Sequence, residues 1–255
     1  MSIALSVNLN KIALIRNSRP GNYPSVTSHG QSCLDAGVDG LTVHPRPDQR
    51  HIRPSDVTAI SELVEDYPNT EFNVEGNPFA EARGDYPGFL SLVENNKVHQ
   101  ATLVPDDDSQ ATSDHGFDLT VDAEKLKPVI QRLHDAGIRV SLFMDPDCDQ
   151  IKLAKQIGAD RIELYTGPYA EAFRNNSSNL DELFEKYSKA AETTFEVGLG
   201  LNAGHDLDRQ NLPRFTTVHA LKEVSIGHAL TVDAIELGLI PAIEAYLNIC
   251  RVKSI

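Results

Sequence analysis

Three stretches of the chain, LDAGVDGLTV (34–43), LHDAGIRVSL (133–142) and AKQIGADRIEL (154–164), share one pattern. In each, a segment with helical spacing of apolar residues ends at a glycine, and a short run of aliphatic residues follows. A glycine just past a helix commonly adopts the left-handed conformation that ends the helix. The pattern therefore predicts helices that lead directly into buried strands, as in a parallel sheet.

The same alternation extends over the whole chain. Strands are predicted at 4–9, 39–44, 70–75, 100–105, 138–145, 160–165, 198–204 and 223–228. Helices are predicted at 25–36, 55–66, 79–95, 122–136, 148–158, 179–196, 208–219 and 229–238, with a terminal one at 241–251. Eight such units in 255 residues match one (β/α)₈ (TIM) barrel, with extra helices, as a single domain over residues 1–255. A doubly wound sheet would need a glycine-rich loop after the first strand, where NLNKIALIRN (8–17) has no glycine.

Composition excludes several classes of function. The chain has 23 Lys and Arg against 37 Asp and Glu, a net charge of -14, so nucleic acid and anionic membrane are unfavourable partners. No apolar run approaches the roughly 20 residues of a membrane span, and the N-terminal segment is unlike a signal peptide, so we expect a cytoplasmic protein. Cys33, Cys148 and Cys250 are too few and too widely spaced for a disulfide scaffold, and Cys33 and Cys250 are expected in the core.

Polar residues fall at the carboxyl ends of the predicted strands. They are Asn8, His44, Glu75, Asp145, Glu163 to Thr166, His205, and Gly227 with His228. In a barrel these ends form the active-site face. Each residue alone has a structural interpretation: His44 could be a satisfied strand-end histidine, and His205 could cap the next helix. Their coincidence at one rim favours a catalytic site. An ionised Glu163 in particular is costly inside a barrel without partners, which favours a functional role for it.

Two segments are predicted to bind anions. HPRPDQRHIRPSDV (44–57) holds Arg46, Arg50, His51 and Arg53, and its prolines stiffen a loop whose guanidinium and imidazole donors suit phosphate or carboxylate. IGHAL (226–230) is a glycine turn leading into a helix N-terminus, which is a common phosphate site of barrels. Two anion sites would fit two phosphorylated substrates or one bisphosphate.

The long polar segment 104–120 between the fourth strand and its helix is predicted to be a lid. Thr112 is its candidate hydroxyl donor to a ligand. We expect His115 and the run Asp106–Asp108 to be solvated, because the run lacks the glycine and terminal glutamate of a calcium loop.

Several motifs together resemble a known family. VNLNKIALIRNSR (7–19), TVHPRPDQRHI (42–52), LNAGHDL (201–207) and SIGHAL (225–230) are similar to motifs of the pyridoxine 5′-phosphate synthases (PdxJ family) of bacterial vitamin B6 synthesis. The resemblance covers nearly the whole chain. It implies an octameric barrel that condenses 3-amino-2-oxopropyl phosphate with 1-deoxy-D-xylulose 5-phosphate. The products are pyridoxine 5′-phosphate, phosphate and water, and no metal or organic cofactor is implied.

The resemblance also implies roles for individual residues. His44 and Glu75 match proton acceptors, His205 matches a proton donor, and Glu163 matches a carboxylate that stabilises a transition state. Contacts to the deoxyxylulose phosphate are implied for Arg46, His51 and Thr112. Contacts to the aminoketone phosphate are implied for Asn8, Arg19, Gly227 and His228.

The chain departs from the family at three of its predicted substrate contacts. Asn10 and Lys11 stand where many members have aspartate and histidine, and Asp206 stands where many have glycine. These changes look like those of a distinct branch, because the implied catalytic residues are all present.

Two alternative functions and one feature of assembly complete the expectations. Glu75, Asp145, Glu163 and His205 could hold a divalent ion in a phosphosugar isomerase or aldolase. A barrel that binds phosphosugars without catalysis is the other alternative. Arg19 lies on a proline- and glycine-rich arm, and the resemblance implies that it completes a phosphate site of a neighbouring subunit, in at least a dimer.

Overall fold

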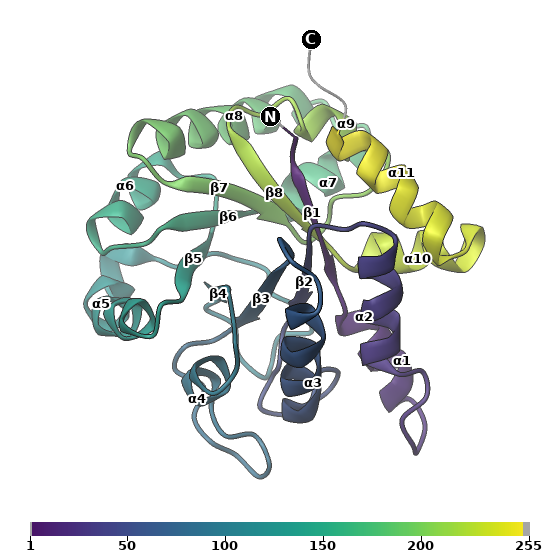
Figure 1. The fold of residues 1–255 in the computed structure, drawn as a ribbon. Coiled ribbons are helices and arrows are strands. Elements are labelled where there is room, and N and C mark those ends of the chain that lie inside the picture. The colour runs from purple at the N-terminus through teal and green to yellow at the C-terminus, as the bar shows by residue number, and fades with distance from the viewer. Residues whose placement is uncertain (1, 252–255) are drawn as a thin grey trace.

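The computed structural model describes residues 2–251 and contains a closed barrel of eight parallel strands in chain order, with β8 paired to β1 (Figure 1). The strands are β1 (Ala4–Asn8), β2 (Gly40–Val43), β3 (Glu71–Gly76), β4 (Gln100–Leu103), β5 (Arg139–Met144), β6 (Arg161–Tyr165), β7 (Gly200–Gly204) and β8 (Leu221–Ile226). The predicted (β/α)₈ fold and all eight predicted strands are confirmed. Gly37, Gly137 and Gly158 have positive φ, as expected of glycines that end helices.

Helices surround the barrel. They are α1 (Asn10–Asn17), α2 (Val26–Asp35), α3 (Pro54–Glu65), α4 (Phe89–Glu94), α5 (Leu119–Asp135), α6 (Cys148–Gln156), α7 (Gly167–Arg174), α8 (Leu180–Glu196), α9 (Leu212–Phe215), α10 (His228–Leu237) and α11 (Leu239–Arg251). An apolar core fills the space between strands and helices, and Cys33 and Cys250 are buried in it as predicted. Between residues 2 and 251, no helix has both the length and the apolar character to cross a membrane.

Two helices were not predicted, and two were predicted too long. Helices α1 and α7 were not predicted, because each starts within two residues of a strand without an intervening loop; α7 begins at Gly167-Pro168, where proline suits a first turn. The helix predicted at 79–95 is only α4, since Pro87 and Gly88, with φ of 95°, keep the preceding segment out of a helix. The helix predicted at 208–219 is the four-residue α9.

The interior of the barrel is polar, unlike the aliphatic layers common in this fold. The buried hydroxyls of Ser6 and Thr42 lie 2.7 Å apart, and Thr102 donates to the Asn73 amide oxygen at 3.0 Å. Further toward the amino ends of the strands, Arg161 pairs with Glu223 at 2.9 Å. The barrel axis is therefore a hydrogen-bonded, charge-containing column that adjoins the site at its other end.

One buried ion pair connects α1 to the loop that carries several site residues. Arg16 is 1% exposed, and its guanidinium bonds to Asp56 at 2.5 Å and to the His51 carbonyl at 2.9 Å. Asp56 also accepts from the Arg53 N–H at 2.8 Å, at the start of α3. Asn17 adds a bond of 2.8 Å to the His51 carbonyl. The loop 44–53 is thereby fixed against α1.

Removing Arg16 tests this connection. Arg16→Met leaves the Asp56 carboxylate buried without its cation, so we expect the free energy of unfolding to fall by about 3–5 kcal/mol. Arg132→Met is the control, because it removes an exposed pair with Glu94 and should cost about 1 kcal/mol or less. Urea unfolding of both variants measures the difference, and equal losses would contradict a structural role for the buried pair.

Candidate active site

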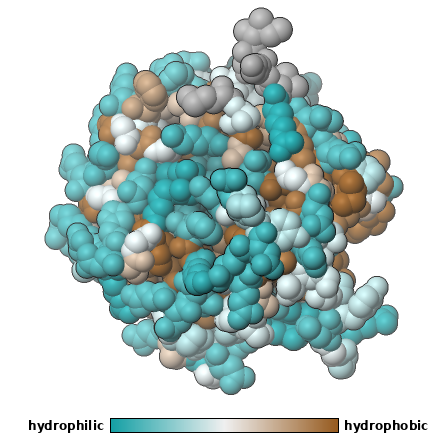
Figure 2. All heavy atoms as spheres, viewed as in Figure 1, coloured by the Kyte–Doolittle hydropathy of each residue, from teal (hydrophilic) through white to brown (hydrophobic). Residues whose placement is uncertain are grey.

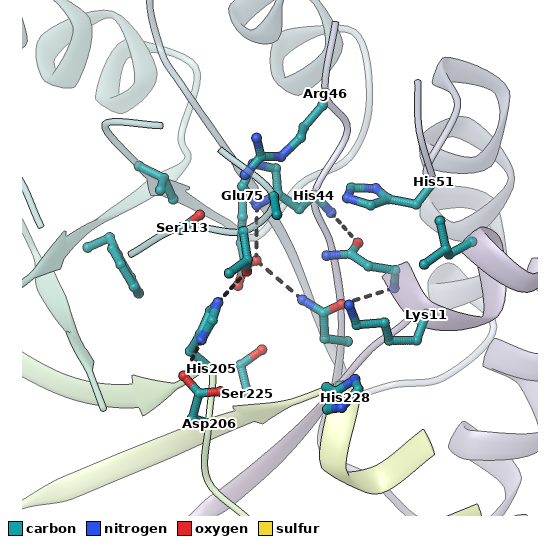
Figure 3. Close-up of a pocket in the computed structure, with 18 of the residues that line it drawn as sticks. Lys11, His44, Arg46, His51, Glu75, Ser113, His205, Asp206, Ser225 and His228 are labelled. Carbon is teal, nitrogen blue, oxygen red and sulfur yellow. Dashed lines mark hydrogen bonds and ion pairs between the residues drawn. The ribbon is translucent and has the colours of Figure 1, made fainter. Parts of the chain in front are cut away.

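A cavity of about 460 Å³ lies at the carboxyl ends of the strands (Figure 3). All predicted site residues except Arg19 line it. They are Asn8, Asn10, Lys11, His44, Arg46, His51, Glu75, Thr112, Glu163, His205, Asp206, Gly227 and His228. Arg50, of the loop predicted to bind anions, lines it as well, and Ser113, Phe143 and Ser225 line it without having been predicted. Arg19 is exposed beyond the end of α1, outside the cavity.

His44 lies between two carboxylates at the end of β2. Its Nε2 is 3.1 Å from Asp106 Oδ2, and its Nδ1 is 3.7 Å from Glu75 Oε2. Burial alone would lower the pKa of His44, but the charges and hydrogen bonds of Asp106 and Glu75 outweigh it and raise that pKa to about 9. At neutral pH His44 is therefore an imidazolium.

Asp106 corrects the expectation of a solvated acidic run. It is buried, pairs with Arg46 at 2.6 Å and accepts from the Ser113 hydroxyl at 3.1 Å. Burial opposes its charge, but His44 and Arg46 hold the pKa of Asp106 below its ordinary value. Its position just past the fourth strand was a usable signal, because the other strand ends also carry polar groups at the rim.

Of the segment 104–120 predicted to be a lid, residues 104–118 form a loop against the rim, and the last two residues begin α5. Arg46 donates to the carbonyls of Asp107 at 2.9 Å and Gln110 at 3.2 Å, and Arg50 donates to the Gln110 carbonyl at 2.7 Å. Thr112 places its hydroxyl 2.5 Å from His205 Nε2. In this arrangement both arginines use donors to hold the lid.

Two asparagines connect β1 to the acid and base groups. Asn8 donates to Glu75 Oε2 at 3.3 Å, and its own Oδ1 accepts from the Asn10 N–H at 3.0 Å. Asn10 in turn accepts from the His44 N–H at 2.9 Å. The amide at position 10 thus fixes the backbone at His44.

His51 is neutral. Burial, followed by the nearby cations His44, Arg46, Arg50 and Lys11, lowers the pKa of His51 to about 3. Its Nδ1 accepts from the Ile52 N–H at 2.9 Å, which places the remaining proton on Nε2. His51 can therefore donate one hydrogen bond to a ligand oxygen in the cavity.

Glu163 faces the cavity from β6. Burial raises the pKa of Glu163 well above its ordinary value, and repulsion from Glu75 and Glu223 adds to the shift. Glu163 therefore keeps its proton to a higher pH than an ordinary glutamate does. Gly204 on the neighbouring strand leaves room for it, since a Cβ there would come within 2.5 Å of Glu163 Oε1.

His205 lies on the opposite side of the cavity from His44 (Figure 3). Its ring packs against Tyr165 with centroids 5.5 Å apart and against Phe143 at 6.5 Å. Its Nδ1 is 2.6 Å from Asp206 Oδ2. The imidazole is thus oriented through one nitrogen by a carboxylate.

Lys11 and the N-terminus of α10 form a positive corner of the cavity. Gly227 packs so closely on Asn8 that a Cβ would lie 3.0 Å from the Asn8 Cβ. Burial, and then the neighbouring Lys11, lower the pKa of His228. Helix N-terminal amides, a neutral imidazole and an ammonium together suit a dianionic phosphate.

Comparison with known proteins identifies the family of the chain. Residues 5–252 match the family model described as pyridoxal phosphate biosynthesis protein PdxJ. The chain belongs to the PdxJ family. It is 50% identical over 252 residues to pyridoxine 5′-phosphate synthase of Xanthomonas axonopodis pv. citri (strain 306), with 98% of each chain covered. It is 49% identical to the enzyme of that name from Mesorhizobium japonicum (strain LMG 29417 / CECT 9101 / MAFF 303099), covering 98% of this chain and 99% of that one.

The fold is shared more widely than the family. The crystal structure of 3-hexulose-6-phosphate synthase from Salmonella typhimurium matches with a TM-score of 0.60 at 16% identity, covering 98% of each chain. At that identity the match concerns the barrel alone.

The sequence offered Glu75, Asp145, Glu163 and His205 as the ligands of a metal-site alternative. Within residues 2–251, no three His, Cys, Asp or Glu side chains are grouped as metal ligands. Asp145, one of the proposed ligands, instead accepts from the Gly116 N–H at 3.1 Å.

The raised pKa of Glu163 leads to a testable prediction about stability. The folded chain holds the Glu163 proton more tightly than the unfolded chain does. The contribution of this proton to the free energy of unfolding is therefore complete below about pH 4.5 and is lost as pH rises. Glu163→Gln is neutral at every pH and escapes the loss. At pH 8 we expect the variant to exceed the wild type in free energy of unfolding by at least about 1 kcal/mol, with a smaller gap at pH 5.

Urea unfolding at both pH values measures this gap. Glu62→Gln, on the exposed surface of α3, is the control for loss of one acidic group. A gap that stays constant between pH 5 and pH 8 would contradict a neutral Glu163.

Proposed function

We propose that this chain is a pyridoxine 5′-phosphate synthase that condenses 3-amino-2-oxopropyl phosphate with 1-deoxy-D-xylulose 5-phosphate. The observation that carries the proposal is the convergence of His44, Glu75, Glu163 and His205, from four strand ends, on one cavity. Ring formation requires imine formation, phosphate elimination, hydration, carbon–carbon closure and dehydration. Each step moves protons, so several acid and base groups in different protonation states are appropriate.

We place the two phosphates at opposite parts of the rim. The aminoketone phosphate would lie at the N-terminus of α10, between Gly227, His228 and Lys11, where amides and an ammonium balance its charge. The deoxyxylulose phosphate would lie near His51 and Arg46. Because Arg46 donates to lid carbonyls, binding there exchanges those bonds for stronger bonds to phosphate oxygens.

His44 and Glu75 would act as a pair with opposite tasks. The imidazolium of His44 can give a proton to the oxygen that leaves as the imine forms, and the Glu75 carboxylate can accept a proton from a substrate carbon or nitrogen. Asn8 orients Glu75 through a bond of 3.3 Å. This refines the role implied by resemblance, because a histidine with a pKa of about 9 starts the cycle as an acid.

His205 and Glu163 would serve the later steps. His205 protonates a leaving hydroxyl from the opposite side of the cavity. Glu163, a neutral acid in the empty cavity, gains a reason to ionise when a cationic imine lies beside it, since an adjacent positive charge favours the carboxylate. Its carboxylate then stabilises that cation.

Glu75→Gln tests the proposed function. The amide keeps the shape of Glu75 and its bond to Asn8 but cannot accept the proton. We expect the wild type to form pyridoxine 5′-phosphate from the two phosphates, and the variant to lose about 10²–10⁴-fold in kcat. Product is measured by mass, and Glu62→Gln is the control.

Substrate binding by the variant is measured separately by calorimetry and should persist. A wild type that makes no product would remove the proposed function, whereas a fully active Glu75→Gln would remove only Glu75 from the mechanism.

We also propose that the enzyme is an oligomer, an octamer by analogy with its family, in the cytoplasm, with the whole chain 1–255 as its repeating domain. Exposed large apolar side chains gather on α1, α10 and the start of α11, and Figure 2 shows an apolar patch over α10 and α11. They are Leu14, Ile15, Val232, Ile235, Leu237 and Ile240. Contiguous exposed apolar area of this kind marks an association surface. The exposed Arg19 lies just past the end of α1. If a partner copy docks on this surface, Arg19 of one subunit comes near the cavity of the other subunit.

Mixed variants test this arrangement. In a hybrid of an Arg19→Ala chain and a His205→Gln chain, the chain with intact His205 receives the intact Arg19 of its neighbour. We therefore expect subunit mixing to restore product formation that neither variant shows alone. Product formation no greater than that of the separate variants, with mass spectrometry showing that subunits have exchanged, would contradict a shared site.

A further inference from the structure

A carboxylate, an imidazole and a hydroxyl form a line across one wall of the cavity. Asp206 Oδ2 lies 2.6 Å from His205 Nδ1, and His205 Nε2 lies 2.5 Å from the Thr112 hydroxyl of the lid. All three residues line the cavity, and Figure 3 shows His205 beside Asp206. Both imidazole nitrogens are thus engaged, one by a carboxylate and the other by a hydroxyl of the lid.

The backbone is built to present this line. Gly204 ends β7 where a Cβ would come within 2.8 Å of the Ser225 carbonyl, and His205 follows with φ of 81°, a conformation that non-glycine residues rarely adopt. Asn211, which is 1% exposed, donates to the Asp206 carbonyl at 3.2 Å and accepts from the Asp208 N–H at 2.9 Å. The strained turn is therefore held through backbone groups, and the Asp206 side chain is not needed to hold it.

The Asp206 carboxylate is charged. Burial alone would raise the pKa of Asp206, but the His205 hydrogen bond and charge, together with Arg174 and His228, lower it. A charged acceptor at 2.6 Å requires a proton on the facing nitrogen, so Nδ1 carries one. The Nε2 atom is then the one that can exchange its proton with a ligand.

We propose that Asp206 is a positioning residue that fixes the Nδ1–H form of His205 and stabilises its imidazolium, so that Nε2 delivers the proton to the substrate. The inference rests on the proposed function and assigns the carboxylate at position 206 a task within it. The Thr112 hydroxyl contacts Nε2 in the substrate-free chain, and a substrate hydroxyl takes its place in the reaction.

The proton balance of the step is complete. Nε2–H gives its proton to the leaving hydroxyl, the C–O bond breaks with its electron pair on oxygen, and water leaves. A base removes a proton from the adjacent carbon, and that electron pair forms the new double bond. His205 remains as a neutral ring with its proton on Nδ1, facing Asp206. Similar carboxylate–imidazole pairs orient general acids and bases in unrelated enzymes.

Two substitutions separate the charge from the shape. Asp206→Asn is isosteric, but its amide can either accept or donate and no longer dictates the Nδ1–H form. Asp206→Ala removes the contact. Glu171→Gln is the matched control, because it removes one acidic charge from the exposed face of the neighbouring α7.

The first measurement needs no activity. Long-range ¹H–¹⁵N correlation spectra of the substrate-free chain report which ring nitrogen carries the proton, and the His205→Gln spectrum assigns the signal. We expect the Nδ1–H form to dominate in the wild type and the control. Its share should fall in both Asp206 variants, including Asp206→Asn if the alanine variant fails to fold.

The second measurement separates kcat from KM in pyridoxine 5′-phosphate formation. We expect kcat to fall about 10-fold or more in both variants with KM within about threefold, because a mispositioned proton donor slows the reaction without weakening substrate binding. An unchanged ring form in both variants, or unchanged kcat despite a changed ring form, would overturn the inference. If the wild type makes no product, the proposed function fails, and the spectra alone still decide whether Asp206 controls His205.

Discussion

The crowding of carboxyl groups at the mouth of a closed barrel is the constraint on which the rest of the site depends. Closure brings Glu75 on β3 and Glu163 on β6 toward one axis, and Asp106 lies beside them, in surroundings from which water is largely removed. Three carboxylates cannot all be charged there without compensation. The structure resolves the conflict in two ways: His44 and Arg46 neutralise Asp106 and Glu75, while Glu163 keeps its proton.

This division of charge gives the site its chemical range. One wall holds an imidazolium next to a carboxylate, the barrel axis holds a carboxyl group whose pKa is raised, and the opposite wall holds an imidazole paired with Asp206. The polar barrel interior supports the arrangement, because Glu223 beneath Glu163 adds to the repulsion that keeps the Glu163 proton in place. The buried Arg16 supports the site in another way, because its bonds to Asp56 and to the His51 carbonyl hold the loop behind His44 against α1.

The strands and most of the site residues could be predicted from the sequence, because the signals that end a helix or begin a strand are local. Glycines after helices predicted the strands, and a parallel closed sheet then required the strand-end residues to meet. Asp106 was misjudged, since three consecutive aspartates look solvated until Arg46 and His44 are known to face the first of them. The neutral state of Glu163 could not be predicted either, because it depends on the spacing of carboxylates from different strands. Helix α7 was missed because its start follows β6 without a recognisable loop.

Infrared spectroscopy of the carboxyl groups tests the central claim most directly. A protonated carboxylic acid has a carbonyl stretching band separate from the bands of a carboxylate. We expect the substrate-free wild type at pH 7 to show such a band, and Glu163→Gln to remove it in the difference spectrum. A difference spectrum at pH 7 that shows the loss of carboxylate bands instead would mean that Glu163 is charged, and would contradict the proposed division of charge.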